Sequence, residues 1–385
     1  MKPKLRFKNF NDEWEETELK NITSEIAYGM NSASKEYDGE NKYIRITDID
    51  ENSNRYSNKD VVSPDGILED KFLVKENDIL FARTGASTGK TYLYNSNDGK
   101  LYYAGFLIKA SIINHNSNFI FQQTKLNKYN NWIRIMSMRS GQPGINSQEY
   151  GSYKFSITNI DEENKISNFL SLIDKKIELQ SKKIEDLKLF KKGLIESEFS
   201  KNYPKVNLRE LLKERKLYSE KGLEYPHVTL SKEGIYDKGE RYNRDFLVKS
   251  DDKQYKITKL NDLCYNPANL KFGVISLNEY GSAIFSPIYV TFEINKKANP
   301  LYIKYYTTRN NFINAVRKYE QGTVYERMAV SPEDFLKFSI KLPSIEIQNK
   351  IVDKLALLDK KINLEQSKLD KISSLKKGLM QNMFV

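Results

Sequence analysis

The sequence predicts an α+β fold in which one arrangement occurs twice: a globular region of mainly β or mixed structure, followed by one long helix. Residues 169–199 and 354–384 are identical at 13 of 31 positions without a gap. Heptad spacing of apolar residues runs through both copies, whereas short β-branched and aromatic runs fill the remaining sequence. We therefore expect an internal pseudo-twofold repeat of two domains rather than a solenoid, whose repeats are much shorter.

The globular regions are predicted at residues 1–158 and 202–343. Runs such as YIRIT, DILFAR, AGFLIKASII, HVTL and SPIYVTFEI are bounded by Gly, Asn, Asp and Pro, which is typical of short strands. ENDILF in the first region parallels LNDLCY in the second. Segments 119–138 and 300–318 are predicted to be helical, and they occupy matching places in the two regions.

The two long helices are predicted at residues 159–201 and 344–385. The apolar seam comprises Ile166, Leu170, Ile173, Ile177, Ile184, Leu187 and Leu194 in the first copy, and Ile351, Leu355, Leu358, Ile362, Leu369, Ile372 and Leu379 in the second. Gln180 and Glu365 interrupt the seam at the same place, which weakens it but fixes its register. Because a lone helix this polar is marginal in water, we expect the two stripes to bury each other as an antiparallel coiled coil.

Composition narrows the class of protein. The chain has 62 Lys and Arg against 51 Asp and Glu, a net charge of +11 and a pI near 9.2, which favours a polyanionic partner, nucleic acid first. One cysteine (Cys264) and two histidines (His115 and His227) cannot form an internal disulfide or a zinc site of the usual Cys/His kind. No apolar run is long enough to cross a bilayer, and the N-terminus lacks a signal-peptide core. We expect a cytoplasmic protein without a membrane partner.

The most suggestive loop is GASTGKT at Gly85–Thr91, directly after the predicted strand DILFA. A phosphate-binding P-loop has four residues between its glycines, and this loop has three, so nucleotide binding is not predicted. The same backbone N–H, hydroxyl and cationic donors suit DNA phosphates or base edges. The predicted DNA-binding residues of the first region are Arg83, Thr84, Ser87, Thr88 and Lys90 on this loop, with Arg45 and Thr47 of the YIRIT run. A plain surface turn is the alternative.

Three further segments are rich in glycine and hydrogen-bond donors. NPANLKFG takes the place of the first loop in the second copy, and MRSGQPGIN and YEQGTVYERM follow the predicted helical segments of the first and second regions. Their predicted DNA-binding residues are Asn266, Asn269 and Lys271, then Arg139, Ser140 and Gln142, and finally Gln321, Thr323 and Tyr325. A structural turn is an equal possibility for any one of them.

No catalytic or metal-binding residues are predicted. NPAN, at Asn266–Asn269, lacks the second proline and the aromatic residue of the NPPY-type loop found in amino-methyltransferases, and no Gly-rich cofactor loop precedes it. PDGILEDK, at Pro64–Lys71, contains the letters of a PD…ExK nuclease motif but with collapsed spacing. We interpret both as accidental.

The chain resembles the DNA-specificity subunit of type I restriction-modification systems. The resemblance covers the whole chain and is most specific at Leu170–Leu194 and Leu355–Leu379, which follow the pattern LxxLDKKI…LKKGLxxxxF, with support from NDILFARTG. The second region departs from it at NPANLKFG, so loop roles transfer there less securely.

This resemblance implies a reader of double-stranded DNA without catalytic activity. The two globular regions would be target recognition domains, each binding one half of a split, asymmetric site. Two modification (methyltransferase) subunits would dock on the helices, and restriction subunits would join that complex. S-adenosylmethionine, ATP and Mg would bind those partner subunits rather than this chain. The alternatives are an autonomous DNA methyltransferase or nuclease, which would need a catalytic motif, and a coiled-coil scaffold, which would bind DNA weakly.

Overall fold

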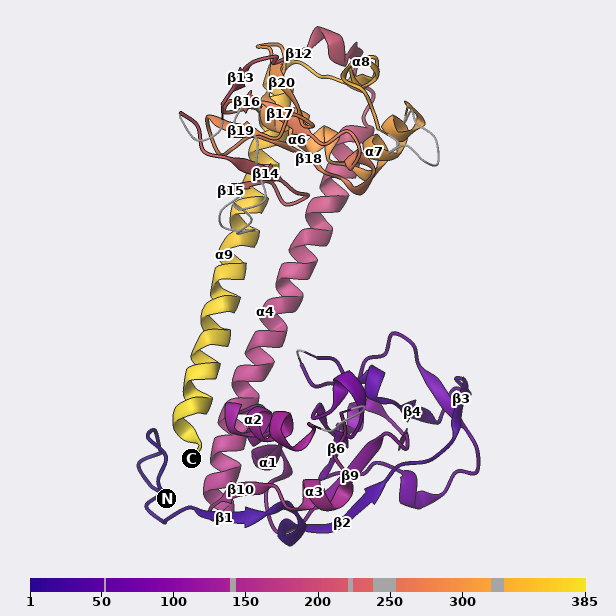
Figure 1. The fold of residues 1–385 in the computed structure, drawn as a ribbon, viewed down its shortest axis with the longest axis vertical. Coiled ribbons are helices and arrows are strands. Elements are labelled where there is room, and N and C mark those ends of the chain that lie inside the picture. The colour runs from indigo at the N-terminus through magenta and orange to yellow at the C-terminus, as the bar shows by residue number, and fades with distance from the viewer. Residues whose placement is uncertain (52, 139–142, 221–223, 238–253, 320–328) are drawn as a thin grey trace. The chain divides into compact units, whose positions relative to one another are not determined.

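The computed structural model describes two compact units (Figure 1). The described residues are 1–51, 53–138, 143–220, 224–237, 254–319 and 329–385. Unit 1 comprises Met1–Ser181 and Ser367–Val385, and unit 2 comprises Lys182–Gln366. Each unit therefore contains part of both long helices. None of the helices in these ranges is long and apolar enough to cross a membrane.

The elements of unit 1 are short strands followed by helices. They are β1 (Glu15–Glu18), β2 (Thr23–Tyr28), β3 (Ala33–Glu36), β4 (Lys42–Ile44), β5 (Val62–Asp65), β6 (Asp78–Ala82), β7 (Thr91–Leu93), β8 (Leu101–Tyr103), β9 (Leu107–Ile112), α1 (Ser117–Gln123), α2 (Asn127–Met136), α3 (Ser147–Gly151) and β10 (Lys154–Ile157). The long helix α4 (Ile160–Ser200) begins in this unit.

Unit 2 likewise consists of short strands followed by helices. Its elements are β11 (Lys205–Asn207), β12 (Leu212–Glu214), β13 (Tyr218–Ser219), β14 (Val228–Leu230), β15 (Ile235–Asp237), β16 (Tyr255–Thr258), β17 (Leu263–Tyr265), β18 (Ile275–Leu277), β19 (Ala283–Phe285), β20 (Val290–Ile294), α6 (Pro300–Thr307), α7 (Asn310–Val316), α8 (Pro332–Leu336) and β21 (Ser339–Lys341). The long helix α9 (Ile345–Met383) follows.

The central sheet has the same strand order in both units. It runs β2-β9-β6-β7 in unit 1 and β12-β20-β17-β18 in unit 2, with antiparallel pairing throughout. Just before each long helix, β10 pairs with β1 and β21 pairs with β11. The predicted α+β repeat is therefore confirmed at the level of sheet topology.

A shared turn introduces the central strand of each sheet. Asn77 and Asn261 adopt left-handed backbone conformations, with φ of 70° and 68°, which asparagine tolerates better than most residues. The next residue is an aspartate in both units. Asp78 accepts a hydrogen bond from the Lys75 backbone N–H at 2.7 Å, and Asp262 is bonded in the same way three residues after Lys259. The Asn-Asp pair that is in register between the two halves thus forms a turn.

The predicted helical segments 119–138 and 300–318 are each divided in the structure. The first breaks between α1 and α2, where the Thr124 hydroxyl donates to the Phe121 carbonyl at 2.7 Å. The second breaks between α6 and α7, where the Thr308 hydroxyl donates to the Lys304 carbonyl at 2.8 Å. Each segment thus forms two short helices instead of one, and a threonine hydroxyl bonded to the preceding turn, an interaction that slightly destabilises helices, lies at each break.

The long helices lie antiparallel within each unit (Figure 1). In unit 2, Lys183 pairs with Glu365 at 3.0 Å and Glu198 pairs with Lys354 at 3.3 Å. As the residue number increases along α4, the residue number of its partner on α9 therefore decreases. The predicted antiparallel coiled coil is confirmed, and Glu365, which interrupts the seam, is buried and paired.

One ion pair occurs twice, with its two ends exchanged between the helices. Asp174 on α4 pairs with Lys376 on α9 at 2.5 Å in unit 1. Asp359 on α9 pairs with Lys191 on α4 in unit 2. Each residue lies 185 positions from its counterpart. The same Asp–Lys contact between antiparallel helices therefore forms once within each unit.

The seam positions separate into buried and half-buried residues. Ile166, Leu170, Ile184, Ile351, Leu355 and Ile362 are buried, while Ile173, Ile177, Leu187, Leu194, Leu358, Leu369, Ile372 and Leu379 are half-buried. The ends of the helices enter the globular cores. Phe384, which directly follows α9, packs on Trp14 and Phe119 in unit 1, and Phe199 of α4 packs on Tyr302 in unit 2.

We expect Ile184→Ala to lower the free energy of unfolding by about 2–4 kcal/mol, because its side chain is only 4% exposed and its removal leaves a cavity. Leu189→Ala on the same helix, at 67% exposure, should change it by less than about 0.5 kcal/mol. Urea unfolding followed by circular dichroism measures both. An equal decrease in the free energy of unfolding for the two variants would contradict the burial of Ile184 in the seam.

Candidate nucleic-acid interface

The Gly-rich loop of unit 1 leaves the sheet at the carboxyl end of β6. Gly85 and Gly89 have φ of 67° and 92°, a region that side-chain-bearing residues rarely adopt. A Cβ atom on Gly89 would lie only 2.7 Å from Cγ2 of Ile133 on α2. The loop therefore packs tightly on α2, and both glycines are needed for its path.

A second predicted loop lies directly beside it. Thr84 forms an isolated antiparallel bridge with Gly144. The Gly85 N–H donates to the Pro143 carbonyl at 2.9 Å, and the Ile145 N–H donates to the Arg83 carbonyl at 2.9 Å. The structure thus brings together two segments that are about 60 residues apart in sequence. The predicted residues Arg139, Ser140 and Gln142 lie outside the described part of the second loop.

The cations of the first loop have partners within unit 1. The Arg83 guanidinium lies over the ring of Tyr28 at 4.7 Å, and its Nη1 donates to the Gly105 carbonyl at 3.5 Å. The Arg83 Nε is buried without a hydrogen-bond partner among the described atoms. Lys90 pairs at 2.8 Å with Glu51, whose side chain is largely exposed. These contacts hold Arg83 and Lys90 in place while leaving donor capacity at the loop.

The hydroxyl groups contribute less directly. The Thr88 hydroxyl donates to the Gly85 carbonyl at 2.8 Å, which stabilises the loop itself. Thr84 and Ser87 are half-buried. DNA binding by these residues stays a prediction.

Arg45 and Thr47 lie after β4, where the expected strand YIRIT gives way to a short 3₁₀ helix at Ile46–Asp48. The Arg45 guanidinium donates two hydrogen bonds to Asp48, each of 2.8 Å. These bonds raise the pKa of Arg45 above its ordinary value. Thr47 is exposed. The structure therefore assigns Arg45 a role in closing this turn and leaves Thr47 accessible.

The equivalent loop of unit 2 follows β17. The Asn266 side-chain oxygen accepts from the backbone N–H groups of Ala268 and Asn269, at 3.1 and 3.3 Å, so it forms the turn. Asn269 is exposed, and Lys271 is half-buried beside the exposed ring of Phe272. The loop reaches the strand-like segment at Val330, whose N–H donates to the Pro267 carbonyl at 3.3 Å. The predicted residues Gln321, Thr323 and Tyr325 lie outside the described residues.

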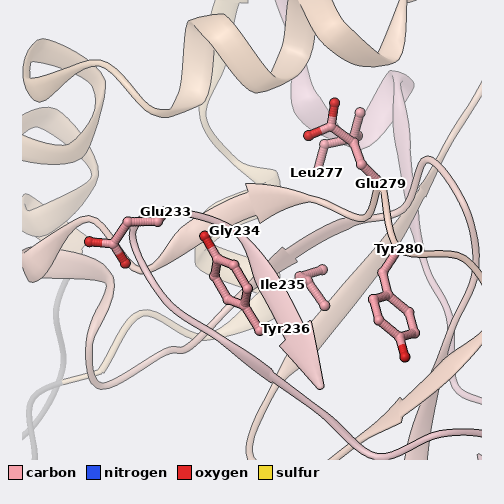
Figure 2. Close-up of a pocket in the computed structure, with 7 residues that line it drawn as sticks. All are labelled: Glu233, Gly234, Ile235, Tyr236, Leu277, Glu279 and Tyr280. Atoms are coloured by element: carbon pink, nitrogen blue, oxygen red, sulfur yellow. The ribbon is translucent and has the colours of Figure 1, made fainter. Parts of the chain in front are cut away.

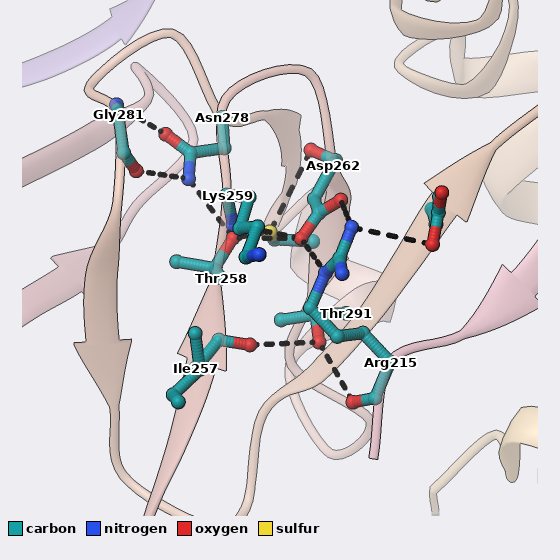
Figure 3. A network of polar contacts seen from close by, with 10 residues as sticks. Arg215, Ile257, Thr258, Lys259, Asp262, Asn278, Gly281 and Thr291 are labelled. Carbon is teal, nitrogen blue, oxygen red and sulfur yellow. Dashed lines mark hydrogen bonds and ion pairs between the residues drawn. The ribbon is translucent and has the colours of Figure 1, made fainter. Parts of the chain in front are cut away.

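A polar network supports the sheet behind this second loop (Figure 3). Asp262 accepts two hydrogen bonds from the Arg215 guanidinium, at 2.7 and 2.9 Å, and approaches the Thr258 hydroxyl. Asn278 donates to the same hydroxyl at 2.9 Å. Burial raises the pKa of the neighbouring Cys264 thiol well above its usual range, so this thiol is unreactive. The network serves packing, and no cluster of metal-ligating side chains occurs among the described residues.

A cavity of about 280 Å³ adjoins the β14–β15 hairpin of unit 2 (Figure 2). Its lining is Glu233, Gly234, Ile235, Tyr236, Leu277, Glu279 and Tyr280. Its charged lining groups are two carboxylates, which do not suit a phosphate. The positively charged loop edges are therefore the better candidates for DNA contact.

Two exposed apolar residues at these edges were not predicted from the sequence. Phe106 precedes β9 in unit 1 and Ile288 precedes β20 in unit 2, and each side chain is 60% exposed. The signal was present as AGFLI and SPIYV, which occupy corresponding places before the two strands. It was overlooked because an isolated exposed apolar residue is common. Their equivalence became visible only when the strand pairing was known.

Together, these features define the class of protein. Two copies of one fold present loops rich in donors on a basic chain, which is the organisation of a two-domain DNA-binding protein. The family model described as "Type I restriction modification DNA specificity domain" matches residues 11–189 and again 201–374. The chain belongs to this family, and a role in DNA specificity follows from that membership.

Solved structures share the fold. The S subunit of a type I restriction-modification system from M. genitalium is 14% identical, with a TM-score of 0.63 over 100% of this chain and 99% of that one. A chain from a structure concerned with complex assembly and conformational transition of the type I R-M system is 13% identical, with a TM-score of 0.56 over 96% and 97%. At these low sequence identities, the comparison shows that this chain shares the fold of the two structures.

We expect Arg83→Ala and Lys90→Ala to weaken DNA binding, since both cations lie on the loop edge of unit 1. If Lys90 contacts a phosphate, its loss should weaken specific and random duplexes alike and reduce the slope of log K against log salt by about one. If Arg83 contacts a base, its loss should affect mainly the specific duplex, by about 1–3 kcal/mol. Fluorescence anisotropy over a salt series measures both effects.

Lys20→Ala is the matched control, because Lys20 also pairs with a glutamate (Glu18) in unit 1 but belongs to the 3₁₀ helix Leu19–Ile22 and not to the loop. Unchanged affinity and salt slope for both loop variants would remove this loop from the interface.

Proposed function

We propose that this chain is the sequence-specific DNA-recognition subunit of a type I restriction-modification complex. Each unit reads one half of a bipartite, asymmetric DNA site, and the paired helices set the distance between the halves. Two methyltransferase subunits dock on the helices, and restriction subunits join through that assembly. S-adenosylmethionine, ATP and Mg belong to those partners, and the chain itself contributes recognition.

The observation that carries this proposal is the contrast between loops and helices. ARTGASTGK in unit 1 is replaced by NPANLKFG in unit 2, although the strands from which they leave are equivalent. The long helices instead keep the same ion pair and nearly the same seam in both copies. Readers of different base sequences are expected to diverge at their loops, whereas surfaces that meet identical partners are expected to stay alike.

The helices also keep exposed apolar residues at matching positions. Leu172 and Leu357 are each 68% exposed, and Leu179 and Leu364 are 59% and 56% exposed. Each pair is separated by 185 positions, and the two leucines within a helix are two turns apart on one side. Repeated exposed apolar residues indicate a protein-binding surface. Their occurrence once in each copy supports two copies of one partner.

We expect that inserting four residues after Ile177 changes the spacer between the half-sites. The insertion adds about 6 Å of helix, which corresponds to about one or two base pairs along DNA. Both half-site sequences should stay the same, because the loops are untouched. Sequencing of methylated motifs in cells that contain the partner subunits gives the readout.

The same four residues inserted after Lys59, in an exposed loop of unit 1, serve as the control and should leave the spacer unchanged. An unaltered spacer after the helix insertion would refute the idea that the helices act as a ruler.

We expect the double variant Leu172→Asp with Leu179→Asp to reduce assembly with methyltransferase subunits by at least about tenfold. Both side chains are exposed, so the change places two charges on the proposed surface without disturbing a core. Size-exclusion chromatography with light scattering, on co-expressed subunits, measures the stoichiometry. Ser181→Asp, at an exposed position of the same helix, is the control, and normal assembly by the double variant would exclude this face.

A further inference from the structure

The same four-residue turn precedes the strand β9 of unit 1 and the strand β20 of unit 2. In unit 1 the Leu107 N–H donates to the Ala104 carbonyl at 2.8 Å. In unit 2 the Tyr289 N–H donates to the Ser286 carbonyl at 3.1 Å. The third residue of each turn is large and apolar: Phe106 in one and Ile288 in the other.

These two side chains project from the protein instead of joining a core. Each is 60% exposed, although the residue that follows Phe106, Leu107, is fully buried. One exposed apolar side chain needs no explanation. The retention of such a residue at the same turn position, in two units whose loops otherwise differ, requires one.

Strand register places both residues on the edge that carries the donor loops. In unit 1, Ala82 pairs with Leu107, and the next residue, Arg83, donates its backbone N–H to the Phe106 carbonyl at 3.0 Å. In unit 2, Tyr265 pairs with Val290, so the loop that starts at the next residue leaves the sheet beside the turn. A ligand that contacts the donor loop of either unit therefore also meets an apolar side chain.

Proteins that distort DNA use this combination. An apolar side chain such as Phe, Leu, Ile or Met is inserted between two base pairs and unstacks them, while flanking donors hold the phosphates. Chemistry on a base also requires that base to leave the stack, and prior unstacking lowers the free energy needed for this step.

We infer that Phe106 and Ile288 are wedge residues, each of which inserts into the base stack of the half-site bound by its own unit. This inference rests on the proposed function and adds to it. Recognition by the chain then includes local distortion of the DNA, which prepares the target base for extrusion by a partner subunit. The two wedges act independently, one in each half-site.

The test uses the complete complex of the chain with its methyltransferase subunits. The probe is a duplex that carries the motif found by sequencing methylated genomic DNA, with 2-aminopurine placed in turn at each position of either half-site. Unstacking raises 2-aminopurine fluorescence. Phe106→Ala should reduce this rise at least about fivefold in one half-site only, and Ile288→Ala should do so in the other half-site only.

Binding to a duplex with one abasic position supplies a second readout. We expect Phe106→Ala to weaken binding to the intact duplex about tenfold, and an abasic position at the unstacked step to restore it to within about twofold, because the unstacking step is then absent. Phe106→Leu, which keeps an apolar side chain, should retain most of the wild-type signal. A folding defect would lower the affinity for both duplexes alike.

The outcomes separate the two proposals. Specific binding by the wild-type complex, with fluorescence in both alanine variants equal to wild type, overturns the wedge and leaves DNA recognition intact. An affinity loss that the abasic duplex does not restore, in alanine variants whose circular-dichroism spectrum and thermal unfolding match the wild type, also overturns it and indicates contact with a thymine methyl group or another surface. Failure of the wild-type complex to prefer its motif overturns the proposed function itself.

Discussion

Burial of a narrow apolar stripe is the constraint on which the structure depends. The long helices are charged on most of their surface, and such helices are stable only when their stripe is covered. Each stripe is covered in the middle by the other helix and at its ends by a globular core. Phe199 and Phe384 show this most clearly, because each ends a helix by entering a cluster of aromatic rings. Helix and globular region therefore stabilise each other.

A second constraint, the turn before each central strand, explains which parts of the globular regions can vary. The turn at Asn77-Asp78 and its counterpart at Asn261-Asp262 fix the start of the central strand through backbone geometry and side-chain acceptors. Once the strand is fixed, the loop at its far end can change its sequence without changing its position. The loop-bearing edges of the two central sheets accordingly share a framework and differ in the groups they present.

The sequence predicted what depends on local pattern. The repeat and the heptad spacing identified the two long helices, and the Gly-rich segments identified the loops. What it did not predict depends on residues far apart in the chain. Arg83 stacks on Tyr28, and Lys90 pairs with Glu51, at separations that no motif encodes. Strand YIRIT and the two helical segments are shorter than predicted for another reason: each ends at a turn where a side chain hydrogen-bonds to a nearby residue, in addition to the backbone bonds.

The end of each long helix lies next to the first strand of a globular region. The end of α4 continues through a few residues into β11, and the end of α9 lies beside Trp14, which directly precedes the corresponding strand β1. The Leu5 N–H also donates to the Asn382 carbonyl at 2.8 Å, so both chain termini lie within unit 1. A permuted chain that begins near residue 203, with Val385 joined to Met1, would therefore keep the same contacts within each unit.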